Sequence, residues 1–381
     1  MAIMKWIKWA GVYALAGAVI WSAGALSAQQ GPKTESAETV AKPRKKGEEP
    51  PVEQKKIPSR MKKNPDGVTP AEGPTFRADV NTVTVDVAVL DNRGAFIPKI
   101  PAGNFRILED NVPQKITSVT MAEAPMTVAM VIEFSNLYQQ YWSSGWYETL
   151  QASYGFLDTL RPDDYVAVIA YDLRPEILSD FSTDKRQAHE ALARLRIAAF
   201  SESNLYDALV DTADRMSDIE GRKSIVLIAS GVDTFSKLTF DKTRKALQTA
   251  GVPIYAIGIM QAIRELYDAR GWMSPLQRLD FLQADNQMRT FARETGGQAF
   301  LPRFFGEFPG IFQAIQQAMR NQYTITYTPT NQVRDGKYRK LKVELVNPET
   351  NEPLRITNEK SKPIKYQILS KAGYTAPREV E

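Results

Sequence analysis

The chain has 381 residues, of which 43% are hydrophobic and 24% are charged, as is typical of a globular protein with a sizeable core. It contains no cysteine, which excludes disulfides, thiolate metal sites and cysteine nucleophiles. Its only histidine, His189, falls in a charged, amphipathic segment and is expected to face solvent. Zinc sites and Ser-His-Asp triads therefore lack their usual members, and we predict no enzymatic activity.

Positive charge is concentrated towards the N-terminus of the chain, whose net charge is +4. Lys5 and Lys8 contribute two of these charges, and residues 31–75, with ten Lys/Arg and seven Asp/Glu, contribute three. Residues 76–381 therefore carry no basic excess, which makes nucleic acid a poor candidate partner for the folded part.

The first 28 residues have the pattern of an export signal. Lys5 and Lys8 precede a nearly uncharged apolar run, residues 9–28, that ends in small residues, as secretory signals do. The same run is long enough to span a bilayer. Residues 1–28 are therefore either a cleaved signal peptide or a retained anchor that tethers the chain to a membrane. In both cases we expect a periplasmic, cell-envelope or secreted protein.

Residues 29–75 have the composition of a disordered linker. They contain eight prolines and no aromatic residue, so they cannot bury enough apolar area to offset the entropy of ordering. Their mixed charges favour a solvated spacer, although the basic clusters would also suit an anionic surface.

Residues 76–124 have the pattern of β structure. Valines at every second position from Val83 to Val89 give a period of two. A turn is expected at Asp91–Gly94, and two strands are expected on either side of the tight connection at residues 109–111. This segment is the first part of a predicted β module.

Strands and helices alternate from residue 125 to residue 321. Continuous apolar runs predict strands at Met126–Glu133, Tyr165–Tyr171, Ser224–Ser230 and Pro253–Ile259. Amphipathic segments predict helices at 183–195, with Thr183 as N-cap, at 205–216 and at 240–250, with Gly251 as the stop. Residues 261–287 interrupt this pattern as an insertion. A helix at 288–294, a short strand at 298–301 and a helix at 310–320 follow.

Residues 322–381 return to the β pattern. Tyr323, Ile325 and Tyr327 alternate with threonines, and Asp335-Gly336 is a hairpin signal. Because neither flanking β segment has enough strands to cover its own core, we expect the two to join into one sandwich-like module. The predicted fold is thus an α/β domain with a doubly wound, mostly parallel, Rossmann-like sheet, inserted in that module.

The segment Glu133-Phe-Ser-Asn-Leu137 is the main candidate for a functional site. It follows a predicted buried strand, and the carboxyl ends of such strands deliver ligand groups in α/β sheets. Together with segments later in the chain, it resembles the von Willebrand factor A-type family, in particular exported bacterial proteins that carry this domain inside a β module. The resemblance covers residues 80–377. The other segments on which it rests are Leu160–Val168, Ser203–Leu209, Arg222–Thr234, Gly251–Gly258 and Lys371–Tyr374.

The resemblance implies a metal-ion-dependent adhesion site built from three loops, and here its ligand set is depleted. Glu133 replaces the family's aspartate, Ser135 is retained, and Leu137 stands where a second serine is usual. Ser203 replaces a threonine, and Ser230 stands where an aspartate is usual, with Asp233 as a candidate substitute. Because Mg²⁺ requires near-octahedral oxygen ligands, weak binding of Mg²⁺ or Mn²⁺ is the most we expect, and no cofactor is required. Alternatively, Glu133 and Ser135 satisfy backbone donors in a loop.

An aromatic cluster directly follows the Glu133 loop. About half of these residues are expected in the core and the rest on an exposed platform, and Tyr and Trp are favoured at protein-binding hot spots. We therefore predict an exported, adhesion-type module that binds a protein partner through this surface. The alternative is a metal-independent structural or assembly protein of the cell envelope. The candidate contact residues are Tyr138, Tyr141, Trp142 and Trp146.

Overall fold

The computed structural model describes residues 82–121, 124–136, 150, 153–195, 200–357 and 362–378. All of them belong to one compact unit, residues 41–381. Residues 9–28, the candidate anchor, lie outside the described residues. Among the described helices, none combines the length and the hydropathy needed to cross a bilayer.

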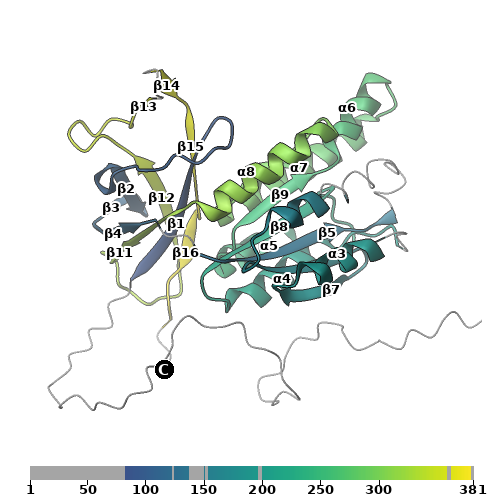
Figure 1. The fold of residues 1–381 in the computed structure, drawn as a ribbon, viewed down its shortest axis with the longest axis horizontal. Coiled ribbons are helices and arrows are strands. Elements are labelled where there is room, and N and C mark those ends of the chain that lie inside the picture. Colours follow the sequence, from purple (N-terminus) through teal and green to yellow (C-terminus); the bar gives the residue numbers. More distant parts are fainter. Residues whose placement is uncertain are drawn as a thin grey trace, which may run out of the picture. The chain divides into compact units, whose positions relative to one another are not determined.

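The first and last described segments form a β module of two four-stranded antiparallel sheets (Figure 1). The first sheet has the order β15 (Tyr366–Ser370), β1 (Val83–Asp91), β11 (Tyr323–Tyr327), β4 (Ile116–Thr120). The second has the order β16 (Gly373–Thr375), β12 (Tyr338–Leu345), β2 (Phe105–Glu109), β3 (Val112–Gln114). The short 3₁₀ helix η1 (Ala102–Asn104) precedes β2, and β13 (Ile356–Thr357) pairs with β14 (Pro363–Ile364).

Each sheet of the β module combines strands from both ends of the chain. Val85 of β1 pairs with Ile325 of β11, and Ile107 of β2 pairs with Val343 of β12. The inward-facing residues of both sheets form a single buried cluster, as expected when two half-buried sheets pack face to face. The predicted union of the two β segments is confirmed.

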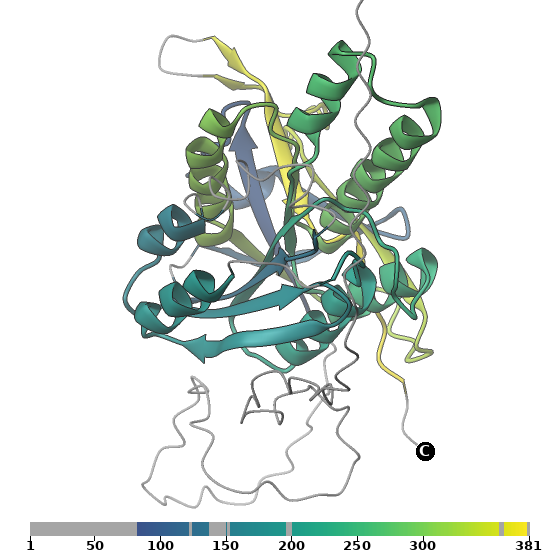
Figure 2. The ribbon, with the colours of Figure 1, turned by 90° about the vertical axis from the view of Figure 1, so that its right-hand side faces the viewer.

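The central segment forms a six-stranded sheet between two layers of helices (Figure 2). Its order is β10-β9-β8-β5-β6-β7, and only β7 is antiparallel to its neighbour. The predicted doubly wound, mostly parallel sheet is therefore confirmed. The strands are β5 (Met126–Glu133), β6 (Tyr165–Tyr171), β7 (Pro175–Ser182), β8 (Arg222–Ala229), β9 (Ile254–Gly258) and β10 (Ala299–Phe300).

Helices cover both faces of this sheet, so β5 is buried along its whole length. One face packs against α3 (Lys185–Arg194), α8 (Phe308–Arg320) and the helical residues 153–159. The other face packs against α4 (Leu205–Ser217), α5 (Phe240–Ala250) and α7 (Pro275–Thr295). Helix α6 (Gln261–Ala269) and α7 form a helical pair, and η2 (Phe305–Glu307) leads into α8.

Three elements of the α/β domain differ from the sequence prediction. The antiparallel edge strand β7 was not expected. The N-cap of α3 is Asp184, whose carboxylate accepts a hydrogen bond from Arg186 N, and not Thr183. The insertion is helical throughout most of its length, because α7 begins at Pro275, capped by Ser274, and continues through the helix predicted at 288–294.

The hairpin predicted at Asp335-Gly336 is wrong. The flanking strands β11 and β12 lie in different sheets of the β module. The Asp335 backbone instead bridges to Arg378, and its carboxylate accepts hydrogen bonds from Lys337 N and the Arg339 guanidinium. The Asp-Gly turn therefore serves a crossing between sheets, which local sequence does not distinguish from a hairpin.

Candidate functional site

The candidate residues lie at the carboxyl edge of the six-stranded sheet. Glu133 is the last residue of β5, and Ser230 directly follows the neighbouring strand β8. Ser203 immediately precedes the segment that enters α4, and its carbonyl accepts hydrogen bonds from Thr234 N and Phe235 N, at 2.9 and 3.1 Å. The three loops that the sequence predicted to converge are thus joined by hydrogen bonds.

The Glu133 carboxylate is buried and bridges two of these loops. Its Oε1 accepts a hydrogen bond from Ser135 Oγ at 2.8 Å, and its Oε2 accepts one from Ser230 N at 2.7 Å. Only 1% of the Glu133 surface is exposed. Burial raises the pKa of this carboxyl, the hydrogen bonds from Ser230 and Ser135 oppose the increase, and the charge of Asp233 adds to it. The side chain therefore works as an internal acceptor.

Two buried hydroxyl groups lie beside this carboxylate without hydrogen bonds of good geometry in the described structure. They belong to Ser203 and to Tyr171, the last residue of β6. Burial raises the pKa of Tyr171 well above its ordinary value, and the charges of Glu133 and Asp233 contribute, while nearby Ser203 opposes the shift. Tyr171 was not predicted as a site residue, because in a sequence an aromatic residue at the end of an apolar strand is indistinguishable from a core residue.

Asp233 supports helix α4. Its Oδ1 accepts hydrogen bonds from Tyr206 N at 3.3 Å and from Ser236 Oγ at 2.5 Å. Negative groups at a helix N-terminus are stabilised by the unpaired N–H groups there. Burial raises the pKa of Asp233, and its hydrogen bonds oppose that shift. The proposed substitute for the family's second aspartate thus already has a structural role.

The residues present do not fit a divalent cation. Mg²⁺ and Mn²⁺ need several carboxylate or hydroxyl oxygens free to coordinate. Both oxygens of Glu133 and one of Asp233 already accept protein hydrogen bonds, and Ser135 Oγ donates one. Within the described ranges, no group of three or more acidic or histidine side chains is arranged to hold a metal.

His189 is half-buried and does not project freely into solvent as expected. Its Nε2 lies 3.2 Å from Asp158 Oδ1, and its ring stacks on Tyr154 with centroids 5.3 Å apart. Its partners lie in the helical residues 153–159. The histidine therefore links that helix to α3 on one face of the sheet, away from Glu133.

An exposed apolar surface lies on the helical pair whose base packs on the loop after β8. Helix α6 begins shortly after β9, and the N-terminal half of α7 carries large side chains that are exposed. Figure 2 shows the backbone of this helical pair projecting from the rest of the domain. The base of α7 contacts the loop after β8: a Cβ on Gly231 would lie 2.7 Å from Met288 Cε. We call the exposed part the α6–α7 tip; it consists of Trp272, Leu276, Leu279 and Leu282, which are 44–69% exposed.

Charged side chains on this helical pair are largely neutralised locally. Arg264 pairs with buried Asp285 at 2.6 Å, Arg278 pairs with Asp268, and Arg270 lies over the Trp272 ring at 4.8 Å. The α6–α7 tip is thus apolar with little net charge, a composition suited to protein contact. The predicted contact residues Tyr138, Tyr141, Trp142 and Trp146 lie outside the described residues, as does Leu137.

Residues 139–299 match the von Willebrand factor type A domain family. This part of the chain is a von Willebrand factor type A domain. The family resemblance predicted from sequence is therefore confirmed for these residues. No curated protein matches the chain.

Solved structures similar to this chain include other proteins with A-type domains. Conserved hypothetical protein BatB from Bacteroides thetaiotaomicron is 16% identical over 35% of this chain and 66% of that chain, with a TM-score of 0.30. The vWF domain of the type V pili tip protein Mfa5 from Porphyromonas gingivalis is 14% identical over 52% of this chain and 97% of that chain, with a TM-score of 0.40. A von Willebrand factor type A structure from Catenulispora acidiphila is 12% identical over 77% of this chain and 75% of that chain, with a TM-score of 0.39. The chain spans just under two thirds of the BatB structure. These likenesses carry no information about ligands or partners of this chain.

Proposed function

We propose that the protein is an exported, protein-binding module that contacts its partner through the carboxyl edge of the A-type domain without a bound metal. The observation that carries the proposal is the α6–α7 tip, whose large apolar side chains are exposed and whose helix α7 packs at its base on the loop after β8. An exposed apolar group of this kind is typical of protein-interaction sites. Export follows from the signal-like pattern of residues 1–28.

Metal independence is supported by the hydrogen bonds of Glu133. In a metal-dependent site, these oxygens would have to exchange Ser135 Oγ and Ser230 N for a cation. That exchange would leave the buried Ser230 N without its acceptor, which costs about 1–3 kcal/mol. We infer that the three loops are held together by hydrogen bonds and present a fixed surface for binding.

Adhesion and envelope assembly are two forms of this function. An assembly role is favoured by the β module, because the A-type domain is inserted in the sequence between strands of that module, which pair with each other. In either case we infer a non-enzymatic role. A tether through residues 9–28 would keep the binding surface at the membrane.

The function can be tested by capturing partners from the native envelope with the full chain and a Trp272→Ser, Leu276→Ser, Leu279→Ser triple variant. We expect the triple variant to lose partners that the parent retains both in EDTA and in Mg²⁺. A Val333→Ser variant is the matched control, because Val333 is 62% exposed on the β module. An unchanged partner set in the triple variant would reject the assigned surface.

Isothermal titration calorimetry with MgCl₂ and MnCl₂ tests metal independence separately. We expect no saturable heat with the parent protein. Saturable binding that is lost in Ser135→Ala would contradict the proposal and restore a metal-dependent adhesion mechanism.

A further inference from the structure

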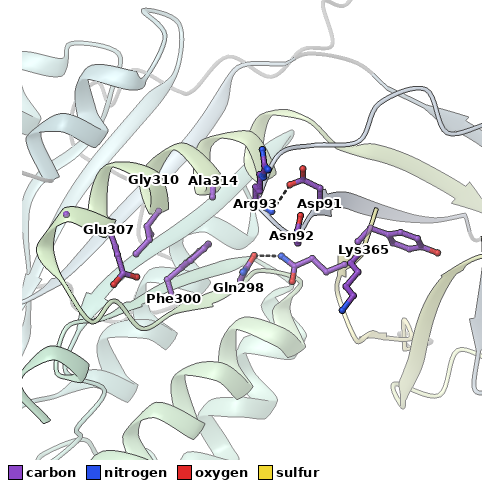
Figure 3. A pocket seen from close by; sticks show the side chains of 14 residues that line it. Asp91, Asn92, Arg93, Gln298, Phe300, Glu307, Gly310, Ala314 and Lys365 are labelled. Carbon is purple, nitrogen blue, oxygen red and sulfur yellow. Dashed lines mark hydrogen bonds between the residues drawn. The ribbon is translucent and has the colours of Figure 1, made fainter. Parts of the chain in front are cut away.

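A cleft of about 650 Å³ lies between the A-type domain and the β module (Figure 3). Gln298 and Phe300 of the β10 region line one side, and Gly310 and Ala314 of α8 line another. The turn after β1 and the start of β15 complete it. Ligand sites in proteins have volumes of about 300–1,000 Å³, so the cleft is large enough for a specific ligand.

Two free sheet edges meet at this cleft. β10 is the outermost strand of the six-stranded sheet and β15 is the outermost strand of a β-module sheet, and in the described structure they do not pair with each other. They approach closely at one end, where a Cβ on Gly296 would lie 2.6 Å from Lys371 N. Further along, Gln367 Nε2 of β15 donates a hydrogen bond to Oε1 of Gln298, the residue before β10, at 3.0 Å. Free edges of this kind are templates for an added strand.

Of the four charged side chains that line the cleft, two carboxylates and two cations, the cations are the ones left available to a ligand. Asp91 and Glu307 are already bound by backbone donors: Asp91 Oδ1 accepts from Arg93 N and Ala95 N, and Glu307 Oε1 accepts from Arg303 N and Phe304 N. The guanidinium of Arg93 and the ammonium of Lys365 are both exposed, and neither has an ion-pair partner in the described ranges. An acidic ligand would match these two cations.

The wall of the cleft next to Arg93 is held in place. Gly94 has a φ of +80°, and a Cβ there would lie 2.8 Å from Ala314 Cβ on α8. The turn therefore packs directly on the helix in a conformation that glycine adopts without strain. A fixed wall reduces the entropy lost when a ligand binds.

We propose that this cleft binds an extended, acidic peptide segment of a partner protein along the free edges of β10 and β15. Main-chain groups of the peptide pair with a strand edge, and a glutamate or aspartate side chain faces Arg93 and Lys365. Figure 3 shows Lys365 at the end of the cleft opposite Glu307 and Phe300, so the acidic side chain lies towards the β module. This site is separate from the α6–α7 tip.

The probes are fluorescein-labelled nine-residue peptides that alternate valine with glutamate, lysine or threonine, measured by fluorescence anisotropy with the full chain. We expect the glutamate peptide to bind tightest, and its affinity to fall with added salt because exposed charges are screened. Arg93→Glu combined with Lys365→Glu should weaken it at least about tenfold. Lys242→Glu, an exposed change in α5 on the opposite face of the sheet, should leave binding unchanged.

A second variant fills the cleft without changing charge. No atom lies within 4 Å of a Cβ built on Gly310, so Gly310→Phe places a ring in the cleft and should abolish binding of the glutamate peptide. Gly155→Phe is the matched control, because Gly155 is also helical with equally open space. Circular dichroism confirms that each variant is folded.

Three results would overturn the proposal. They are no binding of any peptide, binding that Gly310→Phe leaves intact, and binding of an acidic oligosaccharide in the cleft in place of the peptide. Failure of these experiments leaves the partner capture by the α6–α7 tip unaffected, so the two proposals are distinguishable.

Discussion

Arg320 and Asp164 form a buried ion pair, with Arg320 Nη2 2.7 Å from Asp164 Oδ2, although they are 156 residues apart in the chain. Asp164 also accepts hydrogen bonds from Met126 N at 2.9 Å and Arg161 N at 2.8 Å. The pair therefore joins the end of α8 to the start of β5 and to the turn before β6. It fixes the amino edge of the sheet, opposite the Glu133 site.

Replacing Arg320 with Met is expected to destabilise the protein by about 3–5 kcal/mol, because it leaves the Asp164 carboxylate buried without its counter-charge. The measurement is urea denaturation followed by circular dichroism at 25 °C. Arg186→Met is the control, because Arg186 pairs with Asp184 at the surface and that change should have little effect. Equal losses in the two variants would contradict a structural role for the buried pair.

Replacing Glu133 with Ala is expected to destabilise the A-type domain more than replacing it with Gln. Alanine leaves Ser230 N without its acceptor, at a cost of about 1–3 kcal/mol, and removes the hydrogen bond from Ser135 Oγ. The glutamine Oε1 can still accept from Ser230 N, and its amide can donate to Ser135 Oγ. The measurement is again the free energy of unfolding.

Glu202→Ala is the matched control, because Glu202 is exposed in the loop next to Ser203. If the glutamine variant were as unstable as the alanine variant, the negative charge of Glu133 would be required for stability. That result would contradict the hydrogen-bonding role and favour a cation bound to Glu133.

The sequence predicted the central strands best where burial is complete. β5 and β6 have the predicted bounds, because helices on both faces select continuous apolar runs. β7 was missed because it is a half-buried edge strand with Glu176 and Asp180 in its sequence. The full length of α7 was missed because residues 261–287 were predicted as an insertion, although Leu276, Leu279 and Leu282 recur at near-helical spacing.

The candidate site was predicted in location but not in its contacts. Parallel strand order is enough to bring Glu133, Ser203 and Ser230 to one edge. The direction of the Asp233 side chain towards α4 depends on loop geometry after β8, which the sequence does not specify. The participation of Tyr171 depends on the pairing of β6 with β5, because that neighbour relationship places its hydroxyl beside Glu133.

Gly231→Ala is expected to destabilise the protein more than Gly221→Ala. Both glycines have a positive φ, +80° and +88°, which costs other residues about 1–2 kcal/mol. At Gly221 no atom lies within 4 Å of an added Cβ, whereas at Gly231 it would lie 2.7 Å from Met288 Cε and 3.0 Å from Ala284 O. The difference between the two thermal midpoints measures how tightly α7 packs on the loop after β8. Equal shifts would show that this packing is loose.

Lys371 provides a pH-dependent prediction. Burial lowers the pKa of its ammonium group, the charge of Asp86 opposes the shift, and the charge of Lys223 adds to it. Between this lowered pKa and the ordinary value near about 10.4, the unfolded chain binds more protons than the folded chain. Stability contributed by this group therefore rises with pH across that window, and the ionised, half-buried lysine lowers stability below it.

Lys371→Met should consequently stabilise the protein at pH 7, where the parent has to bury a charged group, and the gain should shrink as the pH approaches about 10.4. Chemical denaturation of both proteins between pH 6 and pH 10 gives the difference in unfolding free energy at each pH. Lys365→Met is the control for the loss of an exposed ammonium group. If the difference in unfolding free energy for Lys371→Met did not vary with pH, the ammonium group would be shown to reach solvent. Only a desolvated lysine makes the free energy of unfolding depend on pH in this range.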